Sequence, residues 1–220
     1  MDRAPILDRA AFIRAHTRVL PVPHAPEISL HLADEATELW QKTEDELGAI
    51  GLPPPFWAFA WAGGQALARY LLDHPAEVAG KRVVDFATGS GLVAIAAMQA
   101  GAADVLAADI DPFCAAAVAL NAAANGVAVD FTDADLLGAP APAADLILAA
   151  DICYEKPMAE AVMAWLINAH AAGTRVLIGD PGRAYFPKSG LVKLAEYRVP
   201  TSRELEDAEV KRTAVWTLSL

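Results

Sequence analysis

A strand-like segment that runs into a pair of glycines constrains the fold of this chain more than any other feature. Val83 and Val84 are β-branched and apolar, as a parallel strand covered on both faces requires. Gly89 and Gly91 follow, and glycine allows sharp turns and a close approach of the backbone to a ligand. Residues 92–100 are apolar, rich in alanine and free of helix breakers. The stretch therefore predicts a strand, a tight turn and a helix, and open α/β sheets bind ligands at such a turn.

Two classes of ligand are bound by a turn of this kind. Residues 89–94 match the dinucleotide pattern G-x-G-x-x-G/A, which alone is a weak indication. An acid, Asp85, precedes the glycines, so the order is Asp-x-x-x-Gly-x-Gly. Asp85 and Thr88 disfavour an NAD-dependent dehydrogenase, whereas a carboxylate at the strand end suits a ligand with a cationic amino-acid end. A purely structural strand-turn-helix is the simpler alternative for this motif taken alone.

The composition narrows the class of protein further. The chain has 220 residues, of which 55% are hydrophobic and 20% charged, so we expect a globular fold with a substantial core. Its net charge of −11 argues against a general affinity for nucleic acid or anionic membranes. Cys114 and Cys153 are too few for a disulfide framework, and the histidines show no metal-ligand spacing. With no secretory signal pattern and no apolar run of membrane-spanning length, we expect a cytoplasmic protein without a metal.

Strand-like and helix-like segments alternate through the rest of the chain. The expected strands after the first are 105–108, 127–131, 145–150, 175–178, 196–199 and 213–218, and the expected helices are 113–124 and 155–169. No helix of crossover length clearly separates the last two strands, which are therefore expected to pair antiparallel. The sequence predicts an α/β fold with a Rossmann-like, seven-stranded, mostly parallel sheet and an antiparallel edge strand.

The first 55 residues are predicted to form an N-terminal extension that packs on a core domain of residues 56–220. Within the extension, residues 8–20 predict an amphipathic helix that is ended by prolines, residues 28–32 a short strand, and residues 34–47 a second helix. A structural cap on the core and a substrate-facing lid are equally open interpretations.

Acids lie at the ends of the strands that follow the glycine turn. Asp109 stands about 20 residues past the glycines, the spacing at which a carboxylate reaches ribose hydroxyls in such folds. Asp135 follows the next strand, where it can accept from an adenine amine. Asp151 and Tyr154 follow the fourth strand, where the reacting centre of this fold class lies. The simpler alternatives are polar loops and, for Asp151, a cap on the following helix.

An aromatic segment, residues 56–61, precedes a helical run over residues 66–72. Trp61 is followed by Gly63 and Gly64, which leaves an indole beside bare backbone and suits the wall of a ligand pocket. Packing in the core is the alternative for these aromatics.

Together these residues resemble the class I, seven-β-strand methyltransferases that use S-adenosyl-L-methionine. Asp85 through Gly91 resembles their first motif. Asp151-Ile152-Cys153-Tyr154 resembles the Asp-x-x-Tyr signature of the protein-lysine methyltransferases within that class. Residues 55–58, 61–67 and 179–183 are similar to the members that act on the electron transfer flavoprotein β subunit.

The resemblance implies S-adenosyl-L-methionine as the methyl donor and S-adenosyl-L-homocysteine as the product. The residues it assigns to the cofactor are Trp61, Asp85, Ala87, Thr88, Gly89, Gly91, Asp109, Ile110, Asp135 and Asp151. It assigns catalysis to Asp151, which would orient the substrate ammonium and secondarily accept its proton, and to Tyr154 as a channel wall.

The implied substrate is a protein lysine, with the electron transfer flavoprotein β subunit expected first and a ribosomal protein second. A small-molecule, nicotinamide-type N-methyltransferase uses the same cofactor site and stays open. Asp151-Ile152-Cys153-Tyr154 departs from the Asn/Asp-Pro-Pro-Tyr of enzymes that methylate nucleobase amines or glutamine amides, which disfavours those substrates. A non-catalytic binding module would leave Asp151 and Tyr154 unexplained. We expect a monomer with no nucleic-acid or membrane partner.

Overall fold

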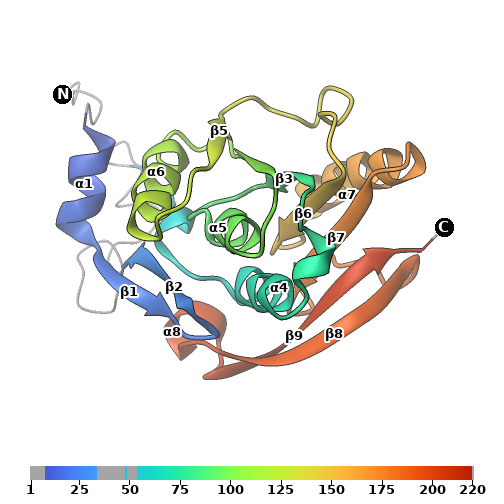
Figure 1. Cartoon of the computed structure of the whole chain (residues 1–220). Coiled ribbons are helices and arrows are strands. Elements are labelled where there is room, and N and C mark those ends of the chain that lie inside the picture. The colour runs from blue at the N-terminus through green and yellow to red at the C-terminus, as the bar shows by residue number, and fades with distance from the viewer. Residues whose placement is uncertain (1–7, 34–47, 49–53, 220) are drawn as a thin grey trace.

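The computed structural model describes residues 8–33, 48 and 54–219, and its centre is a seven-stranded sheet (Figure 1). The strand order is β5-β4-β3-β6-β7-β9-β8. The strands are β3 (Arg82–Phe86), β4 (Asp104–Ala108), β5 (Asp130–Thr132), β6 (Leu146–Ala150), β7 (Arg175–Asp180), β8 (Leu191–Pro200) and β9 (Val210–Leu218).

The first five strands across the sheet, β5 to β7, run parallel, while β9 is antiparallel to both of its neighbours. The predicted mostly parallel sheet with an antiparallel edge is therefore confirmed. The reversed strand β9 lies between β7 and the edge strand β8. The strands β8 and β9 pair antiparallel because the chain between them contains only the short helix α8 (Arg203–Glu206), which is too short for a parallel crossover.

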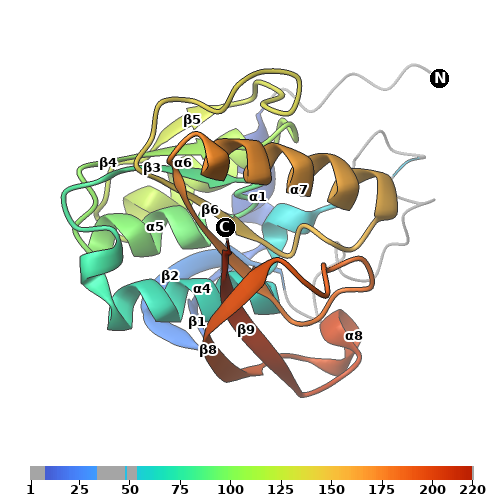
Figure 2. The ribbon, with the colours of Figure 1, turned by 90° about the vertical axis from the view of Figure 1, so that its right-hand side faces the viewer.

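Helices cover both faces of the sheet. Figures 1 and 2 show α4 (Ala62–Asp73) and α5 (Leu92–Gln99) on one face and α7 (Lys156–Ala171) on the other. The helix α6 (Cys114–Ala124) packs beside α5, where its Val118 joins the same hydrophobic core. All residues of α5 from Leu92 to Ala97 are buried, which explains why its sequence is apolar all round. In the described ranges no helix is long and apolar enough to cross a membrane.

The N-terminal residues form a helix followed by a hairpin. The helix α1 (Arg9–His16) ends before Thr17, and the strands β1 (Arg18–Val22) and β2 (Ala25–Leu32) then pair antiparallel. The prediction of one helix over residues 8–20 was therefore wrong in its last four residues. Leu20 precedes a proline, and the residue before a proline disfavours the helical conformation. The expected strand 28–32 is confirmed as part of β2, and the expected helix 34–47 lies outside the described residues.

The hairpin is attached to the core through α6. Asn121 Oδ1 accepts a hydrogen bond from His31 N at 2.7 Å, and Asn125 Oδ1 accepts from Ser29 N at 2.9 Å. Asn125 Nδ2 also donates to Ser29 O at 2.6 Å. These contacts attach the hairpin to the core, whereas the N-terminal extension and its boundary at residue 55 stay predictions.

The helix α4 begins four residues earlier than the predicted 66–72, with Gly63 and Gly64 in its first turn. Glycine is needed at position 63 because a Cβ there would collide with the carbonyl oxygen of Gly179 and the carboxylate of Asp151. Gly63 thus allows α4 to approach β7. The edge strand β5 (Asp130–Thr132) is shorter than the strand predicted over residues 127–131.

Candidate active site

A cavity of about 530 Å³ lies at the carboxyl ends of β3, β4 and β6. It is lined by all but one of the residues assigned to the site from the sequence, namely Trp61, Asp85, Ala87, Thr88, Gly89, Asp109, Ile110, Asp135, Asp151 and Tyr154. The exception, Gly91, begins α5 in the left-handed conformation (φ 82°), where a Cβ would lie 3.2 Å from Val118 Cγ2. Gly91 therefore lies on the side of the turn that faces Val118 and does not line the cavity.

The charges along this cavity have one predominant sign. Among its described lining residues, five are aspartates and one, Arg183, is cationic; the aspartates are Asp85, Asp109, Asp111, Asp135 and Asp151. Carboxylates at close range favour positively charged ligands. A site of this kind suits a cationic donor and a cationic amine.

Asp85 closes the glycine turn from inside. Its Oδ2 accepts from Thr88 Oγ1 at 2.5 Å and from Ala94 N at 3.0 Å, which ties the end of β3 to the first turn of α5. Burial raises the pKa of Asp85 to about 7. The carboxylate thus has a structural task in addition to the predicted one at the amino-acid end of the cofactor, which stays a prediction.

Asp109 is held beside the same turn. Its Oδ2 accepts from Gly89 N at 2.9 Å and its Oδ1 from Asp111 N at 3.0 Å. A carboxylate has about four acceptor positions, so these two bonds leave capacity for a ribose hydroxyl. Ile110 next to it is 71% exposed, an apolar side chain at the cavity that suits a flat base. Asp135 accepts from Leu137 N at 2.9 Å on the same side, where the predicted adenine would lie.

Aromatic side chains form the opposite wall. Trp61 Nε1 donates to the carbonyl oxygen of Phe56 at 3.0 Å, and the ring centroids of Phe56 and Tyr154 are 5.8 Å apart. Tyr154 is 47% exposed, which places its ring at the mouth of the cavity. Burial, and then the charge of Glu155, raise the pKa of Tyr154, so its hydroxyl is a hydrogen-bond donor at neutral pH.

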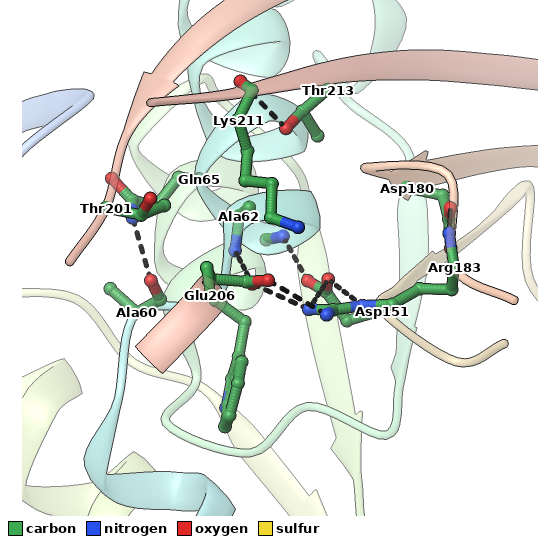
Figure 3. Close-up of polar contacts among 12 residues, drawn as sticks. Ala60, Ala62, Gln65, Asp151, Asp180, Arg183, Thr201, Glu206, Lys211 and Thr213 are labelled. Atoms are coloured by element: carbon green, nitrogen blue, oxygen red, sulfur yellow. Dashed lines mark hydrogen bonds and ion pairs between the residues drawn. The ribbon is translucent and has the colours of Figure 1, made fainter. Parts of the chain in front are cut away.

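Asp151 has three hydrogen-bond donors around its carboxylate (Figure 3). Its Oδ2 accepts from Gly64 N at 2.9 Å, and its Oδ1 accepts from Arg183 Nε at 3.2 Å and Nη2 at 2.7 Å. Burial raises the pKa of Asp151 to about 6, although Arg183 opposes the shift. Asp151 does not cap the following helix, because α7 begins after Glu155.

Two residues near Asp151, Arg183 and Glu206, were not predicted from the sequence as site residues. Arg183 belongs to the stretch 179–183 that carried the resemblance, which was the available signal. Glu206 accepts from Arg183 Nη1 at 2.9 Å and Nη2 at 2.6 Å, and only 1% of its side chain is exposed. Its sequence neighbourhood is acidic and polar, and nothing there indicates a buried carboxylate.

The strand order, the glycine turn and the strand-end carboxylates together define a class I methyltransferase that uses S-adenosyl-L-methionine. Solved structures share this fold. Ribosomal protein L11 methylase from Lactobacillus delbrueckii is 22% identical, with a TM-score of 0.52 over 74% of this chain and 81% of its own. Magnesium protoporphyrin IX methyltransferase from Synechocystis, with bound S-adenosylmethionine, is 17% identical, with a TM-score of 0.55 over 85% and 100%.

Sequence relatives define the particular family. The electron transfer flavoprotein beta subunit lysine methyltransferase of Xenopus laevis is 39% identical over 215 residues, or 94% of this chain and 85% of the relative. The human protein of that name is 36% identical over 216 residues, 94% and 80% of the two chains. Residues 66–172 also match the family model of ribosomal protein L11 methyltransferase (PrmA). The chain belongs to the family of electron transfer flavoprotein beta subunit lysine methyltransferases.

Proposed function

We propose that this enzyme methylates lysine side chains of a protein, and that the protein is the electron transfer flavoprotein β subunit. The observation that carries the proposal is the carboxylate of Asp151 at the cavity, with Tyr154 exposed at its mouth. A long, flexible lysine side chain reaches such a carboxylate from outside. The relatives named for this substrate align over 94% of the chain.

A ribosomal protein is the less favoured substrate. The match to the L11 methyltransferase model ends at residue 172, before β7, β8 and β9. It therefore covers the helices and strands around the glycine turn and leaves out Arg183 and Glu206. The relatives that act on the flavoprotein subunit align over the longer span, which favours their substrate here.

S-adenosyl-L-methionine supplies a methyl group on a sulfonium when it is bound. The residues present fit it: Asp109 would accept from the ribose, Ile110 and Asp135 would flank the base, and the backbone of residues 87–91 would turn around the methionine end. Trp61 and Asp151 complete this proposed pocket on the side of the substrate.

The chain's own residues must hold the lysine nitrogen neutral and in line. Free lysine has a pKa of about 10.4, and a desolvated cavity lowers it. Asp151 attracts the incoming ammonium and raises that pKa, whereas the guanidinium of Arg183 weakens this effect. Asp151 thus orients the amine first and accepts its proton second, while Tyr154 lines the approach. Positioning of this kind supplies most of the acceleration in a displacement that needs no protein nucleophile.

The test is a methyl-transfer assay with purified substrates. The full chain is incubated with isotopically labelled S-adenosyl-L-methionine and with electron transfer flavoprotein, or in parallel with ribosomal protein L11. Mass spectrometry of the proteins should show label on lysines of the flavoprotein β subunit. Label on L11 alone, or on no protein while a small amine is methylated, would overturn the proposed substrate.

A further inference from the structure

The first turn of α4 is capped by carboxylates from two distant segments. Ala62 N donates to Glu206 Oε1 at 3.3 Å, and Gly64 N donates to Asp151 Oδ2 at 2.9 Å. Trp61, at the position before the helix, provides no side-chain cap. The free N–H groups and positive end of a helix favour negative charge at this place. The start of α4 therefore fixes both carboxylates close to the cavity.

Arg183 joins these two carboxylates (Figure 3). Its Nη2 lies 2.7 Å from Asp151 Oδ1 and 2.6 Å from Glu206 Oε1. In addition, Nε donates to Asp151 Oδ1 and Nη1 donates to Glu206 Oε2. The exposed fractions of the three side chains are 19% for Arg183, 12% for Asp151 and 1% for Glu206. A planar guanidinium with paired bonds on two sides fixes orientation as well as charge.

The position of Arg183 is set by its own turn. Asp180 Oδ1 accepts from Gly182 N at 2.6 Å and from Arg183 N at 2.8 Å, and Gly182 has a φ of 87°. The guanidinium carbon lies 5.7 Å from the ring of Trp61. Arg183 is thus fixed by the backbone, by an aromatic face and by two ion pairs before any substrate binds.

This cluster of Asp151, Arg183 and Glu206 contains two carboxylates and one guanidinium, so it has one excess negative charge when all three are ionised. Burial alone would lower the pKa of Arg183, but its two partners raise it above the ordinary value, so Arg183 keeps its charge. Removing one partner of a buried pair leaves a charge without compensation, which is costly. A cation that enters the cavity beside Asp151 supplies the missing compensation.

We propose that Arg183 and Glu206 are positioning residues for methyl transfer, which act through Asp151 on the substrate amine. Arg183 fixes the direction of the Asp151 carboxylate, and Glu206 fixes Arg183 and restores the negative charge that Arg183 removes. The part that concerns the amine rests on the proposed function. The part that concerns the carboxylate of Asp151 does not.

The two positioning residues should act on Asp151 in opposite directions. The titratable groups around Asp151 are Arg183, Glu206, Asp180 and Cys153. Arg183 lowers the pKa of Asp151 and Glu206 raises it. Glu206→Gln keeps an acceptor for Arg183 but removes the charge, so it should lower the pKa of Asp151. Arg183→Met should raise it.

The experiment is a carboxyl-carbon NMR titration of the full chain labelled with ¹³C-aspartate, in which Asp151→Asn identifies the resonance of Asp151. We expect Glu206→Gln to move its titration midpoint down by about one pH unit and Arg183→Met to move it up by a similar amount. The control is Glu209→Gln, which removes the same charge from an exposed pair with Arg203 and should leave the midpoint unchanged. If Arg183→Met does not fold, Arg183→Gln replaces it, because this variant also removes the charge and should likewise move the midpoint up.

The rate of methyl transfer against pH gives the second readout. Its acidic limb should shift with the midpoint of Asp151, and kcat should change more than the KM for the cofactor. Shifts in the same direction for both variants, or equal effects of Glu206→Gln and Glu209→Gln, would overturn the positioning role. A normal titration pattern in a protein that methylates no lysine would instead overturn only the proposed function.

Discussion

The two halves of the site are built in different ways. In the half assigned to the cofactor, Asp85 bonds to Thr88 and Ala94, and Asp109 bonds to Gly89, at most 20 residues away. In the half assigned to the substrate, Asp151 bonds to Gly64 across 87 positions, and Glu206 bonds to Ala62 across 144. The first half is built from the ends of two successive strands, β3 and β4, and the turn after β3, whereas the second exists only when four segments have come together.

The difference predicts that substitutions in the substrate half lower kcat, whereas substitutions in the cofactor half weaken binding of S-adenosyl-L-methionine. Asp151→Asn should lower kcat by about 10²-fold or more, because the amine loses its orienting carboxylate. Affinity for S-adenosyl-L-methionine should change little, as measured by calorimetry. Tyr154→Phe, which keeps the ring and removes the hydroxyl, should lower kcat less than Asp151→Asn. Loss of cofactor affinity in Asp151→Asn would place this residue in the other half.

Asp109→Asn should have the reverse effect. It removes the charged acceptor from Gly89 N and from the proposed ribose contact, at a cost of about 1.5–3 kcal/mol in cofactor binding. The KM for S-adenosyl-L-methionine should rise, while kcat at saturation stays close to that of the original enzyme. Asp135→Asn is the matched control in a more exposed position, with a smaller expected effect. A fall in kcat without a change in KM would contradict the division.

A pair of neighbouring glycines tests the long-range assembly directly. Gly63→Ala places a methyl group against the Gly179 carbonyl and the Asp151 carboxylate, so it should destabilise the fold by about 1–3 kcal/mol and reduce turnover. Gly64→Ala meets Leu92 Cδ2 at 3.6 Å and Val93 Cγ2 at 3.9 Å, both ordinary contacts, and should be neutral or stabilising by up to about 1 kcal/mol. Denaturant unfolding compares the two. Equal losses would show that α4 and β7 are not closely fitted.

The pH dependence of stability tests the local half. Burial raises the pKa of Asp85 to about 7 in the folded state, above its ordinary value of 3.8. The folded state therefore binds the proton more tightly, and this group's contribution to stability falls as pH rises from about 4 to about 7. Asp85→Asn should remove that part of the slope, by at least the 1.4 kcal/mol or so that one pKa unit represents. If the free energy of unfolding changed with pH in the same way in both proteins, the proposed contribution of Asp85 would be contradicted.

The sequence by itself determined the order in which strands and helices follow one another along the chain and the position of the glycine turn. It also placed Asp109, Asp151 and Tyr154 at the carboxyl ends of their strands, because strand ends and short turns depend on residues a few positions apart. It failed at β1, where pairing with β2 replaced the expected helix, and at the start of α4. The strand β1 depends on the neighbouring hairpin strand β2 and on the proline after Leu20, whereas the start of α4 depends on Asp151 and Glu206, which are distant in the chain.

Only the tertiary structure decided what surrounds Asp151. Arg183 lies 32 positions after it, in the turn that follows β7, and Glu206 a further 23, at the end of α8. No local pattern marks either side chain as buried. Their side chains come within hydrogen-bond distance only when β7, α8 and α4 have packed together, and the attraction between them is stronger where water is excluded. A charge that is fixed by packing leaves no periodicity or spacing in the sequence, which is the physical reason why this half of the site had to be seen in three dimensions.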